Sequence, residues 1–298
     1  MRPSFSLLIL CLNLLITQVP NLGWTQDRRV PVAVLGFGDS EIGSLSSETL
    51  AQNLESEPRI QILDRDQATA AAKGAGHTIS LNMSLEEARG LGAALGSDYF
   101  IVGDSQTLRR SPSAGPIYFE SYASIFLVSA RSGRLLMWRR PSFKASTASA
   151  AEKQLLDDLS SHASRSQTLN SIRQAQVDER AKREIAVQKG VPLIESAPDD
   201  DKTANEEGLR LPRPFRRLTP AYPETAASAE VEAVVDVLVD LDSKGEVSNV
   251  EVSRWAGFGL DESTIDTVRQ LHFFPAMRNG TPIPLRVLLR YNFRKPPK

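Results

Sequence analysis

Hydrophobic positions in the first third of the chain form short runs that alternate with helical patterns. Val30–Gly38 is an apolar, β-branched run ended by glycines, which predicts a buried strand. A helix over 45–54, a strand over 59–63 and a helix over 64–73 follow, the last with Asp64 as its N-cap. This part of the chain is therefore predicted to alternate strands with helices.

A capping box marks the start of the next helix. Ser84 and Glu87 have the Ser-x-x-Glu spacing in which each residue satisfies a backbone N–H of the first turn, and Gly96 ends the helix. A strand over 98–104 follows directly. This order predicts a three-layer α/β domain over residues 29–147.

Two longer strands complete this domain. They are predicted over 117–130 and 135–143, joined by a turn at 131–133. One face of the first strand is apolar, as expected of a strand that the core covers on one side only. The residues on that face are Ile117, Phe119, Ala123, Ile125 and Leu127.

The middle of the chain has the composition of a connector. Residues 148–189 contain no proline or glycine and become highly charged near 178–184, which predicts a docked helix that continues into solvent. Residues 190–220 carry several prolines and an acidic run at 199–201, which is typical of a linker. A helix followed by an extended linker would span roughly 150 Å, enough for a tether.

A second, smaller domain is predicted over 221–294. A strand over 231–241, a turn at 242–245 and a returning strand over 247–252 are followed by a helix with Asp261 as its cap. Asn279-Gly280 then turns the chain into a closing strand. Its inward residues are Leu285, Val287, Leu289, Tyr291 and Phe293, and Arg286, Arg290 and Arg294 point outward. The fold class is therefore two-domain, with an α/β domain and a small α+β domain.

The composition limits the kinds of ligand and site that the protein is expected to have. The chain has 298 residues, and 35 Lys+Arg against 36 Asp+Glu give a net charge of -1, so no overall field attracts nucleic acid. Cys11 is the only cysteine, and His77, His162 and His272 are scattered, so the sequence predicts no metal site, redox centre or cofactor.

The N-terminal segment predicts export. The apolar run over 4–16 follows Arg2 and is shorter than the roughly 20 residues that a membrane span needs, so we interpret residues 1–26 as a secretory signal. An A-x-A cleavage site is missing, and an uncleaved inner-membrane anchor is the second interpretation. Either way, the rest of the chain is expected in the periplasm.

No catalytic motif is present. Gly36-x-Gly38 follows a strand, but the third glycine of a dinucleotide loop would fall at Glu41, where a phosphate would have to approach. The chain contains no P-loop, H-E-x-x-H or G-x-S-x-G sequence. We therefore predict no catalytic residues and a protein that is not an enzyme.

The last quarter of the chain carries short motifs in a fixed order: Tyr222-Pro223, a strand hairpin, Leu260-Asp261 at a helix start, an aromatic-x-Pro-Ala turn at 273–276 and Asn279-Gly280. In this order and spacing they resemble the TonB C-terminal family. One departure is that Ala229-Glu230 stands where the family usually has a glycine before its first strand. The motif residues are Tyr222, Pro223, Leu260, Asp261, Phe273, Pro275, Asn279 and Gly280.

This resemblance implies a domain that pairs an edge strand with an extended peptide of an outer-membrane protein, in transmembrane transport or energy coupling. An unclosed edge strand has the free backbone groups for such pairing. The arginines of that strand either select an acidic or polar partner or keep the edge soluble. The predicted partner-binding residues are Arg286, Leu288, Arg290, Asn292 and Arg294.

Residues 30–143 resemble, more weakly, the N-terminal domains of the CsgG, FlgO and TolB group of envelope proteins. This resemblance implies a second function, that of a structural adapter in envelope assembly, and is compatible with a homo-oligomer. Residues 30–143 contain no amphipathic hairpins of membrane-crossing length, so the resemblance does not imply the pore that CsgG forms. The segments that carry it are Val34–Phe37, Leu63–Arg65, Leu95–Gly103 and Ser132–Leu135.

Overall fold

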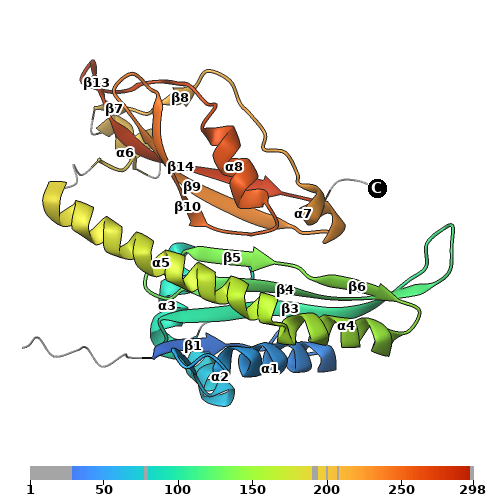
Figure 1. Cartoon of the computed structure of the whole chain (residues 1–298). Coiled ribbons are helices and arrows are strands. Elements are labelled where there is room, and N and C mark those ends of the chain that lie inside the picture. Colours follow the sequence, from blue (N-terminus) through green and yellow to red (C-terminus); the bar gives the residue numbers. More distant parts are fainter. Residues whose placement is uncertain (1–28, 77–79, 190–193, 199–200, 207, 296–298) are drawn as a thin grey trace, which may run out of the picture.

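The computed structural model describes residues 29–76, 80–189, 194–198, 201–206 and 208–295 (Figure 1). The predicted signal or anchor over 1–26 lies outside these residues. Among the helices within them, none is both long enough and apolar enough to cross a membrane.

The first domain is built on one mixed sheet with the strand order β2-β1-β3-β4-β5, and β6 also pairs with β4. β1 pairs in parallel with both β2 and β3, while β4 pairs antiparallel with β3, β5 and β6. The strands are β1 (Val30–Val34), β2 (Ile60–Ile62), β3 (Tyr99–Arg110), β4 (Tyr118–Ser129), β5 (Leu135–Arg139) and β6 (Ser142–Ala145).

The helices of this domain begin and end largely where local chemistry predicts. The Asp64 side chain accepts from the backbone N–H of Gln67, and the capping box of Ser84 and Glu87 is formed. The first helix starts earlier than predicted, because Ser40 caps it by accepting from Gly43. These helices are α1 (Glu41–Glu55), α2 (Arg65–Gly74) and α3 (Leu85–Leu95).

Two details of the long hairpin differ from prediction. The strand expected over 135–143 is split into β5 and β6, with Arg140-Pro141 between them, because proline has no N–H to donate to the β4 ladder. β4 is also buried on both faces: Ile125 and Leu127 pack against the α1 side, and Phe126 and Val128 pack in a second cluster that includes the C-terminal domain.

The two faces of the sheet are covered by different elements. One face packs on α1, α4 (Ala148–Ser160) and α5 (His162–Lys189), as buried Leu50, Leu155 and Ile172 show. The other face packs on α2 and α3 and continues into the C-terminal domain. The predicted three-layer arrangement is thus present, with the C-terminal domain supplying part of one layer (Figure 1).

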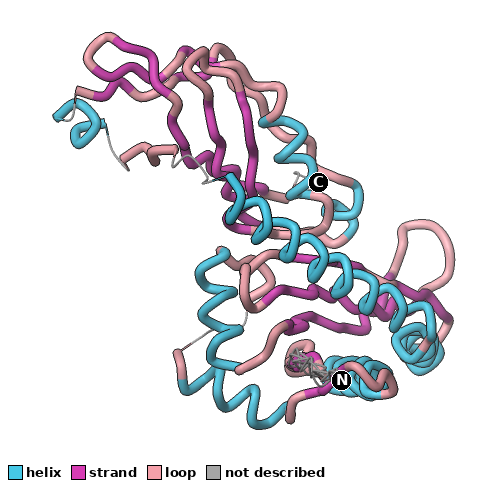
Figure 2. Tube along the Cα trace, turned by 60° about the vertical axis from the view of Figure 1, so that its left-hand side comes forward, coloured by secondary structure: helices cyan, strands magenta, loops and turns pink. Residues whose placement is uncertain are grey.

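The segment over 190–220 is more structured than the predicted linker. It contains α6 (Asp201–Glu206), β7 (Leu209–Arg210) and β8 (Arg213–Pro214). β7 pairs with β12 and β8 pairs with β11, so both short strands join the C-terminal domain. Figure 2 shows α5 along the α/β domain, where it contacts α1, α4 and β5. The docking of β7 and β8 differs from the predicted extended tether.

The C-terminal domain has the predicted hairpin, helix and closing strand, in a sheet of order β10-β9-β14. Its inner face carries Val235, Val237 and Val239, each fully buried. The elements are α7 (Glu224–Ser228), β9 (Ala233–Leu241), β10 (Val247–Arg254), α8 (Leu260–Val268), β11 (Phe273–Phe274), β12 (Ala276–Arg278), β13 (Thr281–Ile283) and β14 (Leu285–Phe293).

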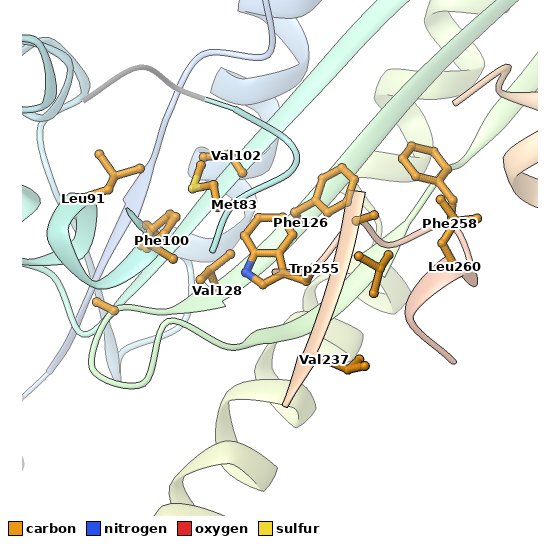
Figure 3. Close-up of a cluster of buried hydrophobic side chains, with 14 of the residues drawn as sticks. Met83, Leu91, Phe100, Val102, Phe126, Val128, Val237, Trp255, Phe258 and Leu260 are labelled. Atoms are coloured by element: carbon orange, nitrogen blue, oxygen red, sulfur yellow. The ribbon is translucent and has the colours of Figure 1, made fainter. Parts of the chain in front are cut away.

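The loop between β10 and α8 inserts into the first domain. Trp255 stacks on Phe126 with a ring-centroid distance of 5.8 Å, and Phe258 lies 5.6 Å from Phe126 (Figure 3). A Cβ on Gly257 would lie 2.6 Å from the Phe126 ring, so only glycine allows this approach. The two domains therefore share one hydrophobic core.

Polar contacts fix the same interface. Trp255 donates its Nε1–H to the carbonyl of Gly133 at 3.1 Å. Asn82 donates from Nδ2 to the carbonyls of Val234 and Trp255 and accepts from the Val234 N–H. With its buried donors and acceptors paired, this contact has the features of a domain interior.

We predict that Trp255→Ala lowers the free energy of unfolding by about 3–5 kcal/mol, because it empties the shared core and removes the bond to Gly133. Denaturant unfolding of the full chain measures this loss. Phe215→Ala, at an aromatic side chain that is 60% exposed, should cost less than about 1.5 kcal/mol. Equal costs for the two variants would contradict a shared core.

Candidate partner-binding edge of the C-terminal sheet

β14 is the outer strand of the C-terminal sheet and is bonded to β9 on one side only. Within a strand, successive residues direct their N–H and C=O groups to opposite sides. The backbone N–H and C=O of Arg286 form hydrogen bonds on the side away from β9. By this alternation Leu288, Arg290 and Asn292 direct their backbone groups to the same free side.

The chain itself occupies the first position of this edge. The N–H of Arg286 donates to the carbonyl of Glu195 at 2.8 Å, and the N–H of Ala197 donates to the carbonyl of Arg286 at 2.7 Å. Within the described part of the chain, no backbone hydrogen bond reaches the outward groups of Leu288, Arg290 or Asn292. The free edge therefore extends from Leu288 to Asn292.

The outer face of the sheet carries two bidentate ion pairs. Arg286 donates from Nε and Nη2 to the carboxylate of Asp240 at 2.5 and 2.9 Å. Arg290 donates in the same way to Asp236 at 2.7 and 2.9 Å. Both aspartates are about 95% buried, with exposures of 4% and 5%. Hydrogen bonds from Arg286 lower the pKa of the Asp240 carboxyl, which keeps it ionised.

These ion pairs show which of the predicted arginines already have a carboxylate partner within the chain. Arg286 and Arg290 compensate carboxylates of the neighbouring strand, while Arg294 is exposed just beyond the end of β14. Sequence reasoning missed Asp236 and Asp240. The spacing in the sequence could have indicated them. Asp236 and Asp240 are four residues apart, and so are Arg286 and Arg290, so two antiparallel strands can align both oppositely charged pairs at once.

We predict that Arg286→Ala lowers the free energy of unfolding by about 1–3 kcal/mol, because it leaves the buried Asp240 carboxylate with only Asn249 as a side-chain partner. The matched control is Arg294→Ala, which removes an exposed arginine and should change stability by less than about 0.5 kcal/mol. Denaturant titration compares the two, and an equal effect would show that the Asp240 pair contributes nothing.

A pocket of about 300 Å³ opens beside the free edge. Its apolar lining comes from the inner side of β14 and from the segment that leads into β11. Three arginines, Arg216, Arg217 and Arg290, also line it. The apolar lining includes Leu218, Leu271, Phe273, Leu289 and Tyr291.

The predicted motif residues build the domain, and one of them, Phe273, also lines the pocket beside the free edge. The Tyr222 hydroxyl donates to the carbonyl of Val231, and its ring packs near Phe293. Pro223 is the residue before α7, Leu260 and Phe273 are buried, and Asn279-Gly280 forms the turn between β12 and β13, with Pro275 just before β12. The motif thus specifies the fold that presents β14.

Asp261 has a different role from the predicted helix cap. Gly259 is the N-cap of α8, and the Asp261 carboxylate instead accepts from the N–H groups of Ala256 and Gly257 at 2.8 and 2.9 Å. It therefore holds the loop that carries Trp255 into the first domain. Burial raises the pKa of this carboxyl to about 7, against the two N–H donors, which lower it.

This raised pKa predicts a pH dependence. The folded chain binds more protons than the unfolded chain between the ordinary pKa of 3.8 and about 7, so the free energy of unfolding falls as pH rises through that range. Asp261→Asn does not titrate and should lack this contribution. Unfolding measured at several pH values compares the two proteins, and parallel pH curves would contradict the raised pKa.

The structure also explains the departure at Ala229-Glu230. Glu230 adopts a φ of 53°, in the left-handed region where a side chain is disfavoured and glycine is not. The turn before β9 therefore has, at Glu230, a backbone conformation that a glycine would adopt without strain. The Glu230 carboxylate forms an ion pair with Lys295 next to this turn.

Comparison with known proteins identifies this domain. Residues 219–294 match the family model described as Gram-negative bacterial TonB protein C-terminal. This part of the chain is a TonB C-terminal domain, as the motif predicted, and the match supports a periplasmic, envelope-associated protein. No curated protein matches the chain. The resemblance of residues 30–143 to the CsgG, FlgO and TolB group stays a prediction.

Solved structures show partial similarity. The TonB C-terminal domain of Pseudomonas aeruginosa is 20% identical, with a TM-score of 0.26 over 29% of this chain and 89% of that one. Lipoprotein GNA1162 from Neisseria meningitidis is 14% identical, with a TM-score of 0.31 over 44% and 94%. The hypothetical protein CT253 from Chlamydia trachomatis is 11% identical, with a TM-score of 0.32 over 44% and 93%.

The described residues hold no group of three or more His, Cys, Asp or Glu side chains placed to bind a metal ion. The strongly shifted carboxyl, Asp261, has its hydrogen bonds within its own loop.

Proposed function

We propose that this protein binds an extended segment of an outer-membrane transport partner in the periplasm, by adding that segment as a strand to β14. The observation that carries the proposal is the run of outward backbone groups at Leu288, Arg290 and Asn292, which no described backbone segment satisfies. A partner strand would satisfy them, and backbone hydrogen bonds of this kind supply affinity with little sequence preference.

Side-chain selectivity would come from the adjacent pocket. Its apolar lining suits an aliphatic or aromatic side chain of the incoming strand. Arg216 and Arg217 line it as well and would favour a partner with acidic residues nearby. Arg286 and Arg290 contribute less to this selection, because carboxylates of β9 already compensate their charges.

A second candidate function is that of a structural adapter in envelope assembly. The observation that favours it is the shared core around Trp255 and Phe126, which fixes the TonB-like domain on the α/β domain. A domain held in this way presents its edge in a set direction, which suits docking. Energy coupling across the periplasm would instead need the long tether that the sequence predicted.

We predict that Leu288→Pro abolishes pairing with the partner, because it removes an outward N–H from the middle of the free edge. Leu288→Ala is the matched control, since it removes the same exposed side chain and keeps the N–H. Pull-down of outer-membrane proteins with the purified full chain measures binding, and circular dichroism checks that both variants stay folded. Unchanged capture by the folded proline variant would reject strand addition at β14.

A further inference from the structure

We propose that Glu195–Ala197 is an internal competitor for the pairing edge, which a partner strand displaces when it binds over the whole of β14. This inference rests on the proposed strand addition. The segment already makes the contact that an added strand would make: it lies parallel to β14, with Ser196 opposite Arg286, and exchanges two backbone hydrogen bonds with it.

A charged contact sets the register of this internal strand. Arg278 on β12 donates to both carboxylate oxygens of Glu195, at 2.9 and 2.5 Å. A bidentate pair of this geometry recognises a carboxylate at one defined position. Any strand that replaces the internal one in the same register is therefore expected to run parallel to β14 and to place an acidic residue opposite Arg278.

The internal strand is short, and its sequence limits its length. In a parallel ladder the next bond would be donated by Leu288 to the carbonyl of Ala197, and no such bond is formed. Pro198 follows, and its ring fixes φ at about −65° rather than the roughly −120° of a parallel strand. The segment thus covers Arg286 and leaves Leu288 to Asn292 free, so a longer strand gains hydrogen bonds that the internal one cannot make.

The ion pair between Glu195 and Arg278 can also be displaced by another strand. Both side chains of the Glu195 and Arg278 pair are partly exposed, at 44% and 35%, so salt and solvent screen it. The competitor is held by its connection to the chain, which keeps its local concentration in the millimolar range, about that of a short flexible linker. A weak partner strand is excluded by this competition, and a longer one overcomes it.

The test uses the full chain and a peptide that copies residues 192–199 (Pro-Leu-Ile-Glu-Ser-Ala-Pro-Asp). Ala197→Pro removes the N–H that binds Arg286 and releases the internal segment, while Ala197→Gly keeps that N–H and serves as control. Fluorescence anisotropy of the labelled peptide should show binding to Ala197→Pro at least ~10-fold tighter than to the wild type or to Ala197→Gly. The same peptide with glutamine in place of Glu195 should bind more weakly.

Amide hydrogen exchange gives an independent readout. The Arg286 amide should be protected in the wild type, exchange faster in Ala197→Pro, and become protected again when the peptide is added. Equal peptide affinity for all three proteins, or no binding to any of them, overturns the competition.

The result is separable from the proposed function. If the peptide fails this test while Leu288→Pro still loses capture of outer-membrane proteins relative to Leu288→Ala, internal competition is rejected and strand addition stands. If the peptide binds as expected while capture is insensitive to Leu288→Pro, the competition stands and the proposed function is rejected.

Discussion

The packing of Trp255 against Phe126 is the interaction on which the arrangement of the whole molecule depends. It converts two segments with separate sheets into one body with a continuous core, and Asp261 and Asn82 hold the loop that makes it possible. Because the core fixes the C-terminal sheet through its β10 side, β14 is left on the opposite edge of that sheet. The contact between the domains and the free edge are thus two consequences of the same packing.

The free edge is a restricted one. An exposed strand with many unpaired backbone groups is a liability, since it pairs with any extended chain. Here the segment Glu195–Ala197 covers its first position, and its hydrogen bonds to β14 stop before Leu288. Among the described residues, the outward backbone groups of Leu288, Arg290 and Asn292 have no backbone partner, and an apolar pocket lies beside them. Under the proposed strand addition, selectivity would combine a backbone contact that any peptide can make with side-chain contacts that few peptides satisfy.

Charge on this surface is mostly compensated within the chain. The arginines of β14 point outward as the strand pattern predicted, yet two of them are bound to the buried carboxylates of Asp236 and Asp240. Such pairs fix the register of β14 against β9, because a shift by one residue would separate both pairs and turn the strand's apolar side chains outward. Arg216 and Arg217, which lie on the segment before the domain, line the pocket together with Arg290.

The sequence by itself determined the local elements. The capping box at Ser84 and Glu87, the stop at Gly96, the hairpin at 242–245 and the alternation of β14 depend on neighbours in the chain, and all are present in the structure. The motif from Tyr222 to Gly280 likewise identified the TonB C-terminal domain. Only the tertiary structure decided which distant residues meet: that Phe126 packs on Trp255 and that Glu195 reaches Arg278. The physical reason is that periodicity and capping are short-range properties, whereas a contact across 83 or more residues depends on how whole surfaces pack.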